Sequence, residues 1–510
     1  MRDDGGMLLA DLVATSAAVA ATRSRTAKVE AVAGALRRVA PEEAPAVVAF
    51  LSGELRQRQI GVGWSSLRDA PPPAEAATLT VAEVDEAFGR IGALAGPGSQ
   101  AARREALGLL FARATAEEAD FLRRLLLGDL RQGALEGVVV SAVAAAADVP
   151  LEAVRRAHML QGDLGEVARI ALAEGAAGLA RVGLEVGRPI HPMLAGTAED
   201  LEEALERIRP AAVETKLDGV RIQVHRSGRD VALFTRTLDE VTARLPEVVE
   251  AALALPVRDV VLDGEAIALR PDGRPHPFQV TSSRLGSRTA RADVPITPQL
   301  FDVLHLDGED LLDRPGAERA EVLHALVAPE ARVDRVVADS LEDARATFDA
   351  AIAAGHEGVV VKALDAPYAA GRRGGGWLKV KPRHTLDLVI LAAEWGHGRR
   401  RGLLSNLHLG ARGPDGGLVM LGKTFKGLTD EMLAWQTQRL QELAVSQEGH
   451  VVHVRPELVA EIAFDGVQTS PRYPGGVALR FARVVRHRPD KPAREASTLE
   501  DVLAIHSRGT

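Results

Sequence analysis

The chain has 510 residues, of which 46% are hydrophobic and 26% are charged, so it has enough material for several folded domains. It contains no cysteine, which excludes disulfides, thiolate zinc sites and cysteine nucleophiles and leaves oxygen and imidazole as metal ligands. The formal net charge of -8 argues against a uniformly basic, histone-like protein, although a local basic stripe remains compatible with nucleic-acid binding.

The first 185 residues are rich in Ala, Leu, Val, Glu and Arg at helical spacing and predict an all-helical domain. Residues 7–21 are largely apolar, but Asp11 interrupts the run and no cationic segment precedes it. They therefore predict an amphipathic helix and not a signal peptide. No apolar run reaches the roughly 18 residues of a membrane span, so we expect no membrane partner.

Within this region, residues 121–150 place arginines beside glycines. The pattern comprises Arg123, Arg124, Arg131, Gly128, Gly133 and Gly137. Helix N-termini at such glycines would offer backbone N–H groups to phosphate oxygens, with the arginines as counter-charges. Glycines at helix contacts and solvated arginines explain the pattern equally well, so both interpretations stay open.

The segment "GRPIHPMLAG" (187–196) predicts a linker, and we assign residues 186–210 to this linker and the start of a catalytic domain. From 211 to 383 the periodicity becomes mixed, which predicts an α+β domain. Its expected strands are 220–225, 231–236, 260–268, 300–305, 358–362 and 377–381. Its expected helices are 198–208, 239–254, 316–327 and 341–354.

Residues 384–510 contain recurring strand patterns and few helical ones. Five short strands, with one helical insertion near 428–444, predict a small Greek-key barrel of the OB type. The expected fold class is therefore multidomain: an all-α N-terminal domain, an α+β domain and a β-barrel C-terminal domain.

Lys216 in "ETKLDGVR" is unusual because the chain has only eight lysines among its 62 basic residues. A strand ending here would place Glu214 and Lys216 on one face before Asp218 and Gly219 turn the chain. A lysine can lose its proton and act as a nucleophile, whereas an arginine, with a pKa above about 12, cannot. A surface lysine in a hairpin is the ordinary explanation for such a motif taken alone.

Other charged residues accompany Lys216 downstream. Near predicted strands lie Lys362, Lys379, Lys381, Lys491, Asp263, Glu265 and Glu357. Compact ammonium groups suit phosphate oxygens, and carboxylates set among them form either structural ion pairs or a Mg²⁺ site shared with substrate phosphates. Phe301 is either a core residue or a base-stacking residue.

Six segments in this order resemble the motifs of the lysyl-nucleotidyltransferase superfamily, and most closely those of the ATP-dependent DNA ligases. The matching segments are "KLDGVR", "LDGE", "FDVLHLDG", "EGVVVK", "WLKVKP" and "RFARVVRHRPDK". The elements "FTRTL", "PYAAGRRGGGW" and "PIHPMLA" are similar to the same family, as is, less specifically, the helical region. The resemblance implies an α+β nucleotidyltransferase (ATP-grasp-like) domain between a DNA-binding domain and an OB-fold domain.

The resemblance also implies a reaction and its residues. Lys216 would accept AMP from ATP, AMP would pass to the 5′-phosphate of a nick, and the 3′-hydroxyl would then displace it. The implied catalytic residues are Lys216, Asp218, Lys379 and Lys381. The implied ATP-binding residues are Glu214, Arg221, Arg236, Glu265, Phe301, Lys362, Arg373, Arg488, Asp490 and Lys491. The implied ligands of Mg²⁺, or of Mn²⁺, are Glu265 and Glu357.

In this resemblance Glu214 reads the adenine amino group through its backbone carbonyl and Phe301 stacks on the ring. Arg480 and Arg483 also match the sixth motif, but the resemblance implies that its residues Arg488, Asp490 and Lys491 meet the ATP tail, and only while the barrel is closed over it. The expected partner is nicked duplex DNA, bound without sequence preference by a monomer in the cytoplasm, in DNA repair, replication or recombination.

Two other classes remain as alternatives. Capping guanylyltransferases and RNA ligases share the lysine motif, and substrate tests with DNA or RNA and with ATP or GTP would separate them. A non-catalytic nucleic-acid clamp that retains an ATP pocket is the second alternative. The ordered set of Lys216, Glu265, Glu357, Lys379 and Lys381 favours the enzyme.

Overall fold

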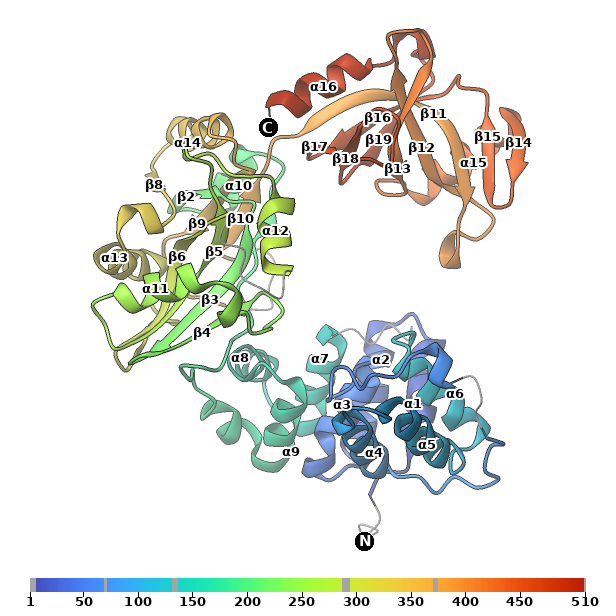
Figure 1. Ribbon diagram of the computed structural model, residues 1–510, viewed down its shortest axis with the longest axis vertical. Coiled ribbons are helices and arrows are strands. Elements are labelled where there is room, and N and C mark those ends of the chain that lie inside the picture. The colour runs from blue at the N-terminus through green and yellow to red at the C-terminus, as the bar shows by residue number, and fades with distance from the viewer. Residues whose placement is uncertain (1–5, 68–70, 131–135, 287–293, 370–374, 509–510) are drawn as a thin grey trace.

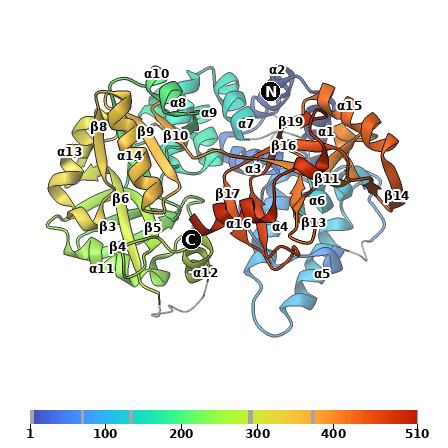
Figure 2. The same ribbon diagram turned by 90° about the horizontal axis from the view of Figure 1, so that it is seen from above.

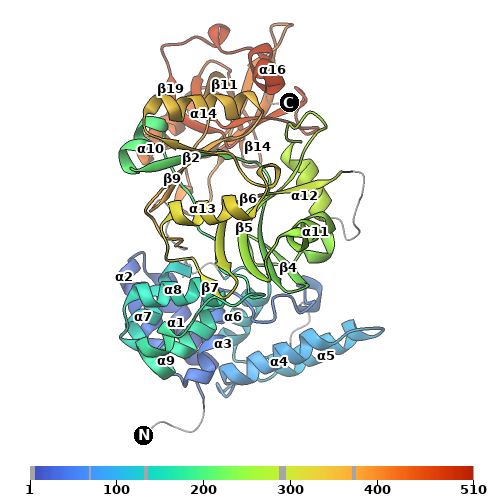
Figure 3. The same cartoon turned by 90° about the vertical axis from the view of Figure 1, so that its left-hand side faces the viewer.

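The computed structural model describes residues 6–67, 71–130, 136–286, 294–369 and 375–508. Three bodies follow one another along the chain: a helical one, a mixed α/β one and a β-rich one (Figure 1). The α/β body lies between the other two in a side view (Figure 3). Seen from above, the helical and β-rich bodies overlap on the same side of it (Figure 2). The expected fold class is confirmed.

The N-terminal body is helical throughout its described residues. Its helices are α1 (Leu9–Ala21), α2 (Arg25–Leu36), α3 (Ala44–Ser52), α4 (Val81–Ala93), α5 (Ser99–Phe111), α6 (Ala116–Leu126), α7 (Glu136–Ala147), α8 (Leu151–Gln161) and α9 (Leu164–Ala180), with 3₁₀ turns at Pro41–Glu43 and Trp64–Leu67. Thr80 and Thr115 each begin a helix with a reciprocal capping box, which satisfies backbone N–H groups that the helix leaves free. The helix expected at 7–21 is confirmed as α1.

The arginine and glycine segment shows features of both interpretations that the sequence left open. Gly128 has a φ of 67° and lies just after the end of α6, so it stops a helix and does not begin one. Gly137 does lie in the first turn of α7. Arg123 and Arg124 lie 3.8 and 3.9 Å from Asp120, as solvated arginines commonly do. Arg131 and Gly133 lie outside the described residues.

The expected linker is packed and not free. The backbone of Ile190 exchanges hydrogen bonds with the side chain of Gln223, and the Met193 amide donates to the Tyr368 hydroxyl at 3.0 Å. Ile190 and Met193 are buried. The segment leads into a short strand, β1 (Gly196–Thr197), which pairs with the strand at Trp377–Val380. The linker therefore forms part of the α/β body.

The α/β body contains two sheets. The first has the strand order β1-β10-β9-β2-β8 and the second has the order β4-β3-β5-β6-β7. The strands are β2 (Ala211–Lys216), β3 (Val220–Ser227), β4 (Asp230–Thr235), β5 (Asp259–Ala268), β6 (Ile296–Leu306), β7 (Glu309–Asp310), β8 (Arg335–Ala338), β9 (Gly358–Ala363) and β10 (Trp377–Val380). The helices are α10 (Leu201–Arg207), α11 (Pro246–Ala254), α12 (Phe278–Gly286), α13 (Gly316–Leu326) and α14 (Leu341–Ala353), with 3₁₀ turns at Thr242–Arg244 and Pro329–Ala331.

Two details of this body differ from expectation. The helix expected from 239 begins only at Pro246, because proline fits the first turn of a helix but not its interior. Strand β8 and helix α12 were not expected, since β8 is short and α12 has polar residues on much of its length.

The C-terminal body is an OB-type barrel with more strands than the five expected. They are β11 (His384–Trp395), β12 (Leu404–Arg412), β13 (Leu418–Thr424), β14 (Ala444–Glu448), β15 (Val451–Val454), β16 (Val459–Phe464), β17 (Gly466–Thr469), β18 (Val477–Arg480) and β19 (Arg483–Arg488). The expected helical insertion is α15 (Asp430–Glu442), and α16 (Leu499–Arg508) was not expected. Two further 3₁₀ turns lie at Gly398–Arg400 and Ala493–Glu495.

Strand β11 closes the barrel. One part of it pairs with β15 and another with β16, while β12 runs along its other edge. The run 451–464, expected as one strand, divides into β15 and β16 around Pro456, which cannot donate to a strand ladder. Among the described residues, no helix is both long and apolar enough to cross a bilayer.

Candidate active site

Lys216 is the last residue of β2, at the point where the two sheets of the α/β body meet. Its Cα pairs with that of Gly358 on β9, and its carbonyl accepts from the Glu357 amide at 3.1 Å. The next turn needs Gly219, because a Cβ there would lie 2.6 Å from the carbonyl oxygen of Ala266. The Lys-x-Asp-Gly spacing therefore delivers the lysine into the gap between the sheets.

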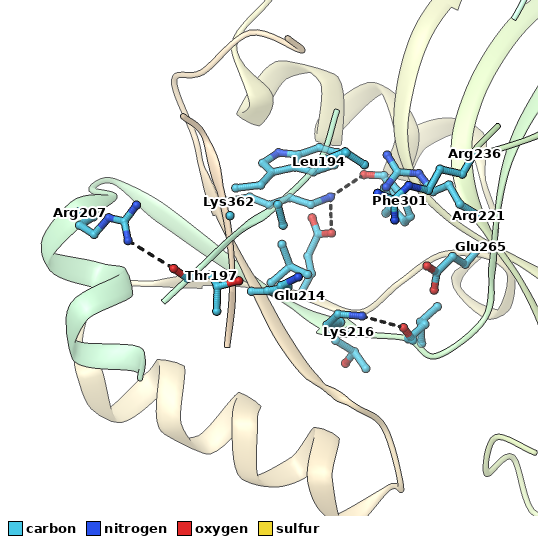
Figure 4. Close-up of a pocket in the computed structure, with 17 residues that line it drawn as sticks. Leu194, Thr197, Arg207, Glu214, Lys216, Arg221, Arg236, Glu265, Phe301 and Lys362 are labelled. Carbon is cyan, nitrogen blue, oxygen red and sulfur yellow. Dashed lines mark hydrogen bonds and ion pairs between the residues drawn. The ribbon is translucent and has the colours of Figure 1, made fainter. Parts of the chain in front are cut away.

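A cavity of about 620 Å³ opens in front of Lys216 (Figure 4). Its lining comes from both sheets and from the linker: Leu194, Ala195, Gly196, Thr197, Arg207, Glu214, Thr215, Lys216, Leu217, Arg221, Arg236, Glu265, Phe301, Val360, Lys362, Trp377 and Lys379. This volume lies within the range of small-molecule sites, and the mixture of aromatic and cationic side chains suits an anionic aromatic ligand.

Three charged side chains form a chain at the floor of the site. Lys216 Nζ pairs with Glu357 Oε2, and Lys381 Nζ pairs with Glu357 Oε1. Burial acts to raise the pKa of Glu357, but the two ammonium groups outweigh it and hold that pKa below its usual value. Glu357 therefore stays ionised and fixes both lysines.

Glu265 also lies near Lys216, but its pKa is shifted in the opposite direction from that of Glu357. Burial raises the pKa of Glu265 from 4.5 to about 7, against the opposing charges of Lys216 and Arg221. The Gly219 amide donates to Glu265 Oε2 at 3.4 Å. Lys216 thus faces one carboxylate that is ionised and a second that exchanges its proton near neutral pH.

The upper part of the cavity is a buried charge cluster beside two aromatic rings. Glu214 pairs with Lys362 Nζ at 2.5 Å and with Arg335 at 2.9 Å. Lys362 Nζ lies 4.5 Å from the Phe301 ring centroid and 4.3 Å from that of Trp377. Burial lowers the pKa of Lys362 in spite of the Glu214 carboxylate. The cluster holds Phe301 and Trp377 edge to face, with centroids 5.9 Å apart.

Arg221 supports Phe301 from the second sheet. It makes a two-pronged pair with Asp263 at 2.6 and 2.5 Å, and the Tyr368 hydroxyl donates to the same carboxylate at 2.6 Å. Burial opposes the charge of Arg221, but Asp263 outweighs it and raises the pKa of the guanidinium. The guanidinium carbon lies 4.7 Å from the Phe301 centroid. Asp263 is fully buried, so this pair is a structural support and not a free ligand.

Comparison with known proteins agrees with these observations. Three family descriptions match the chain: "DNA ligase N terminus" over residues 66–144, "ATP dependent DNA ligase domain" over 192–381, and "ATP dependent DNA ligase C terminal region" over 400–491. A relative from Mycolicibacterium gilvum, named "Probable DNA ligase", is 60% identical and covers 99% of this chain and 100% of its own. The chain belongs to the ATP-dependent DNA ligase family. It is an enzyme of that type, as its motifs predict.

Two further likenesses extend this result. A relative of the same name from Streptomyces griseus is 58% identical, covering 98% of this chain and 99% of its own. A solved structure described as Pmar-Lig_PreS3 has a TM-score of 0.59 at 19% identity and covers 94% of this chain and 99% of that one. The second likeness shows that the fold is shared.

The structure gathers most of the expected ligase residues in one place. Lining the cavity are Glu214, Lys216, Arg221, Arg236, Glu265, Phe301, Lys362 and Lys379. Glu357 and Lys381 join them through the ion pairs with Lys216. Arg373 lies outside the described residues.

Four expected residues lie elsewhere. Arg488 and Lys491 pair with Asp387 of the barrel at 3.1 and 2.8 Å, and Asp490 pairs with Arg488 at 2.8 Å. None of these three barrel residues lines the cavity at Lys216, because a different face of the barrel lies against the α/β body. Asp218 points to that face and pairs with Arg480 at 3.1 Å.

A second cavity, of about 430 Å³, lies where the barrel meets the α/β body, which we call the adenylation domain from here on. It is lined by Thr197, Ala198, Lys379, Lys381, Pro382, Arg383, Asp465, Phe481 and Arg483. The Phe481 side chain is 55% exposed, has a φ of 55°, and lies within 6 Å of Lys381, Lys426 and Arg480. The ring is thus an exposed aromatic surface among cations.

Sequence reasoning missed some residues of the site. Thr197 and Arg207 line the cavity from the linker side, and Arg335 holds Glu214 from the unexpected strand β8. The signal in the linker was weak because "HPMLAG" reads as loop, although its apolar residues hinted at packing. Arg335 carried no signal, since one arginine among 54 is not distinctive.

Proposed function

We propose that this ligase seals nicks between a 5′-phosphate and a 3′-hydroxyl in duplex DNA through a lysyl-AMP intermediate on Lys216. The observation that carries the proposal is the position of Lys216, between Glu357 and Glu265 at the floor of a cavity of nucleotide size. An arginine here would keep its proton and could not attack.

In the first step Lys216 Nζ forms a bond to the α-phosphorus of ATP and pyrophosphate leaves with the electron pair of the broken P–O bond. Nζ must first lose a proton. Glu265 is the better acceptor of the two carboxylates because its pKa is about 7, whereas Lys216 and Lys381 hold the pKa of Glu357 low. Glu357 keeps Lys216 in place.

The adenosine is proposed to occupy the upper part of the cavity. Phe301, braced by Arg221 and Trp377, offers a stacking face, and Arg236 lines the side toward the ribose. The Glu214 carboxylate pairs with Lys362 and Arg335. Following the resemblance to the ligases, we assign recognition of the adenine amino group to the Glu214 backbone carbonyl. Lys362 contributes charge and holds Glu214.

A divalent cation fits the site only in a limited way. Among the described residues no cluster of three or more acidic or imidazole side chains is placed to hold a metal ion. Glu265 and Glu357 could hold Mg²⁺ or Mn²⁺ together with substrate phosphates, in the usual manner of magnesium with few protein ligands. When bound, the ion would neutralise charge on the transferring phosphate. Lys379 and Lys381 supply similar charge from the chain.

The second and third steps take place on DNA. An oxygen of the 5′-phosphate bonds to the α-phosphorus, the P–N bond breaks, and Lys216 Nζ keeps the electron pair and takes a proton from solvent. The 3′-oxygen then loses its proton to solvent, bonds to the 5′-phosphorus, and AMP leaves. The barrel face with Arg480 and Phe481 meets the adenylation domain in the structure and suits these steps, since an exposed ring among cations can contact DNA.

The sixth-motif residues are proposed to serve the first step only. Arg488, Asp490 and Lys491 would reach the ATP tail after the barrel turns, because in the present arrangement they pair on Asp387. We further propose that the enzyme binds DNA as a monomer, without sequence preference, and works in the cytoplasm, since its relatives are bacterial and its substrate is DNA. We place the domain limits at residues 185, 210 and 383.

The test is incubation with α-labelled ATP and Mg²⁺, then denaturing electrophoresis. The wild type is expected to carry the label, and Lys216→Arg and Lys216→Ala are expected to lose it. Lys423→Arg is the matched control, because Lys423 is also a partly buried lysine paired with a glutamate, 30% exposed against 21% for Lys216. Labelling of Lys216→Arg at the wild-type level would contradict the proposal. Sealing of nicked DNA but not of nicked RNA separates the ligase types.

A further inference from the structure

The ion pairs of the active site continue across the domain boundary into the barrel. Lys381 Nζ, which pairs with Glu357, also lies 3.6 Å from Asp465 Oδ2. Four side chains therefore alternate in sign from the barrel to the proposed nucleophile: Asp465, Lys381, Glu357 and Lys216. The barrel thus supplies one of the two carboxylates that contact Lys381.

Asp465 is held firmly in the barrel. It lies between β16 and β17, its amide donates to the Arg480 carbonyl at 3.0 Å, and its Oδ1 accepts from Arg483 at 3.3 Å. Its side chain is 23% exposed. Asp465 is also the carboxylate among the residues that line the 430 Å³ cavity, whose other charged lining residues are Lys379, Lys381, Arg383 and Arg483.

The contact depends on how the barrel is seated. Lys381 lies just beyond β10 in the adenylation domain, whereas Asp465 moves with the barrel. In the turn of the barrel proposed above, which would bring Arg488 and Lys491 to the ATP tail, Lys381 would keep its pair with Glu357 and lose its contact with Asp465. The ammonium is then shared between two carboxylates in one arrangement and paired with one in the other.

We propose that Asp465 is a positioning residue for Lys381 that acts only in the steps on DNA. This inference rests on the proposed function. In the arrangement of the structure, Asp465 attracts the Lys381 ammonium toward the 430 Å³ cavity between the two domains. There the ammonium can neutralise the phosphate oxygens of the adenylated nick. The residue itself touches no reacting atom.

The test separates the steps of the reaction in single-turnover experiments on the full chain. Asp465→Asn preserves shape and removes the charge, and we expect it to seal a pre-adenylated nick about three- to tenfold more slowly. Labelling of the free enzyme by ATP should change by less than about twofold. Asp465→Glu should restore most of the sealing rate.

The matched control is Glu461→Gln, because Glu461 pairs with Arg486 within the barrel at 2.7 Å and lies on the neighbouring strand β16. It should seal at the wild-type rate. Three results would overturn the inference: sealing by Asp465→Asn at the wild-type rate, equal slowing of labelling and sealing, or no recovery in Asp465→Glu. If the wild type itself takes no label from ATP, the proposed function fails instead.

Discussion

Two clusters of cations are proposed to bind ATP, but they lie at different distances from the nucleotide cavity. Lys216 and Lys381 meet at Glu357 beside the nucleotide cavity. Arg488 and Lys491 meet at Asp387, in the barrel and outside that cavity. Each cluster contains a carboxylate of its own domain, and Lys381 of the first cluster also lies 3.6 Å from Asp465 of the barrel. In the proposed function the first cluster already lies beside the nucleotide cavity, whereas the second would enter the site only through movement of the whole barrel.

The comparison shows that each cation is paired with a carboxylate close to it, although the proposed reaction uses cations from both domains. A cation that binds a phosphate needs a counter-charge while the phosphate is absent, because an unpaired, partly buried charge is costly. Glu357 and Asp387 fill that role, with side chains 14% exposed in both cases. The predictions below test whether the two carboxylate-bound clusters act in different steps.

The largest effect is expected from Glu357→Gln. It leaves Lys216 and Lys381 together without their shared counter-charge, so Lys216 loses its position. We expect labelling by ATP to fall about 100-fold or more. Glu394→Gln is the control, since Glu394 likewise binds a lysine, Lys423, and a histidine, His408, within the barrel. A drop of less than about threefold in Glu357→Gln would remove Glu357 from the mechanism.

A smaller, step-specific effect is expected from Arg488→Ala. Labelling by ATP should fall roughly 10- to 100-fold because one guanidinium no longer meets the ATP tail. Sealing of a pre-adenylated nick should stay near the wild-type rate, because that step does not use the tail. Single-turnover rates for the two steps measure the contrast. Equal loss in both steps would show that Arg488 supports the barrel and does not distinguish the two clusters.

The smallest effect concerns Glu265 and pH. Its pKa is raised by burial to about 7 from an ordinary 4.5, so the folded state binds more protons than the unfolded state between these values. Stability contributed by this group therefore falls as pH rises from about 4.5 to about 7. Glu265→Gln should remove this loss and gain about 2–3 kcal/mol relative to wild type between pH 5 and pH 8.

Thermal unfolding midpoints of the nucleotide-free protein at the two pH values check this prediction. The difference between Glu265→Gln and wild type should grow toward pH 8. If it stays constant, the pKa of Glu265 is not raised in the folded protein, and the reason for preferring Glu265 over Glu357 as the proton acceptor for Lys216 is lost.

Much of the molecule was predictable from its sequence. The order of the motifs around Lys216, Glu265, Glu357 and Lys381 predicted the family and the three-part fold, which the structure and the comparisons confirm. Alternation predicted that Glu214 and Lys216 share one face of a strand, since residues two apart do so, and both line the cavity. The roles of the individual site residues stay predictions.

Other features depend on long-range geometry that sequence patterns do not contain. The orientation of the barrel decides that Asp218 meets Arg480 while Arg488 remains on Asp387, and no local pattern encodes a rigid-body orientation. The raised pKa of Glu265 arises from burial between two sheets. The contact of Arg335 with Glu214 depends on the pairing of β8 with β2, which no local sequence pattern indicates.

The most direct test of the account is to find where AMP is attached. The full chain is incubated with ATP and Mg²⁺ without DNA, digested, and analysed by mass spectrometry. The account predicts one AMP on the peptide that contains Lys216, and its loss when nicked DNA is added. AMP on any other residue, or an unmodified Lys216 in protein that seals nicks, would contradict the account.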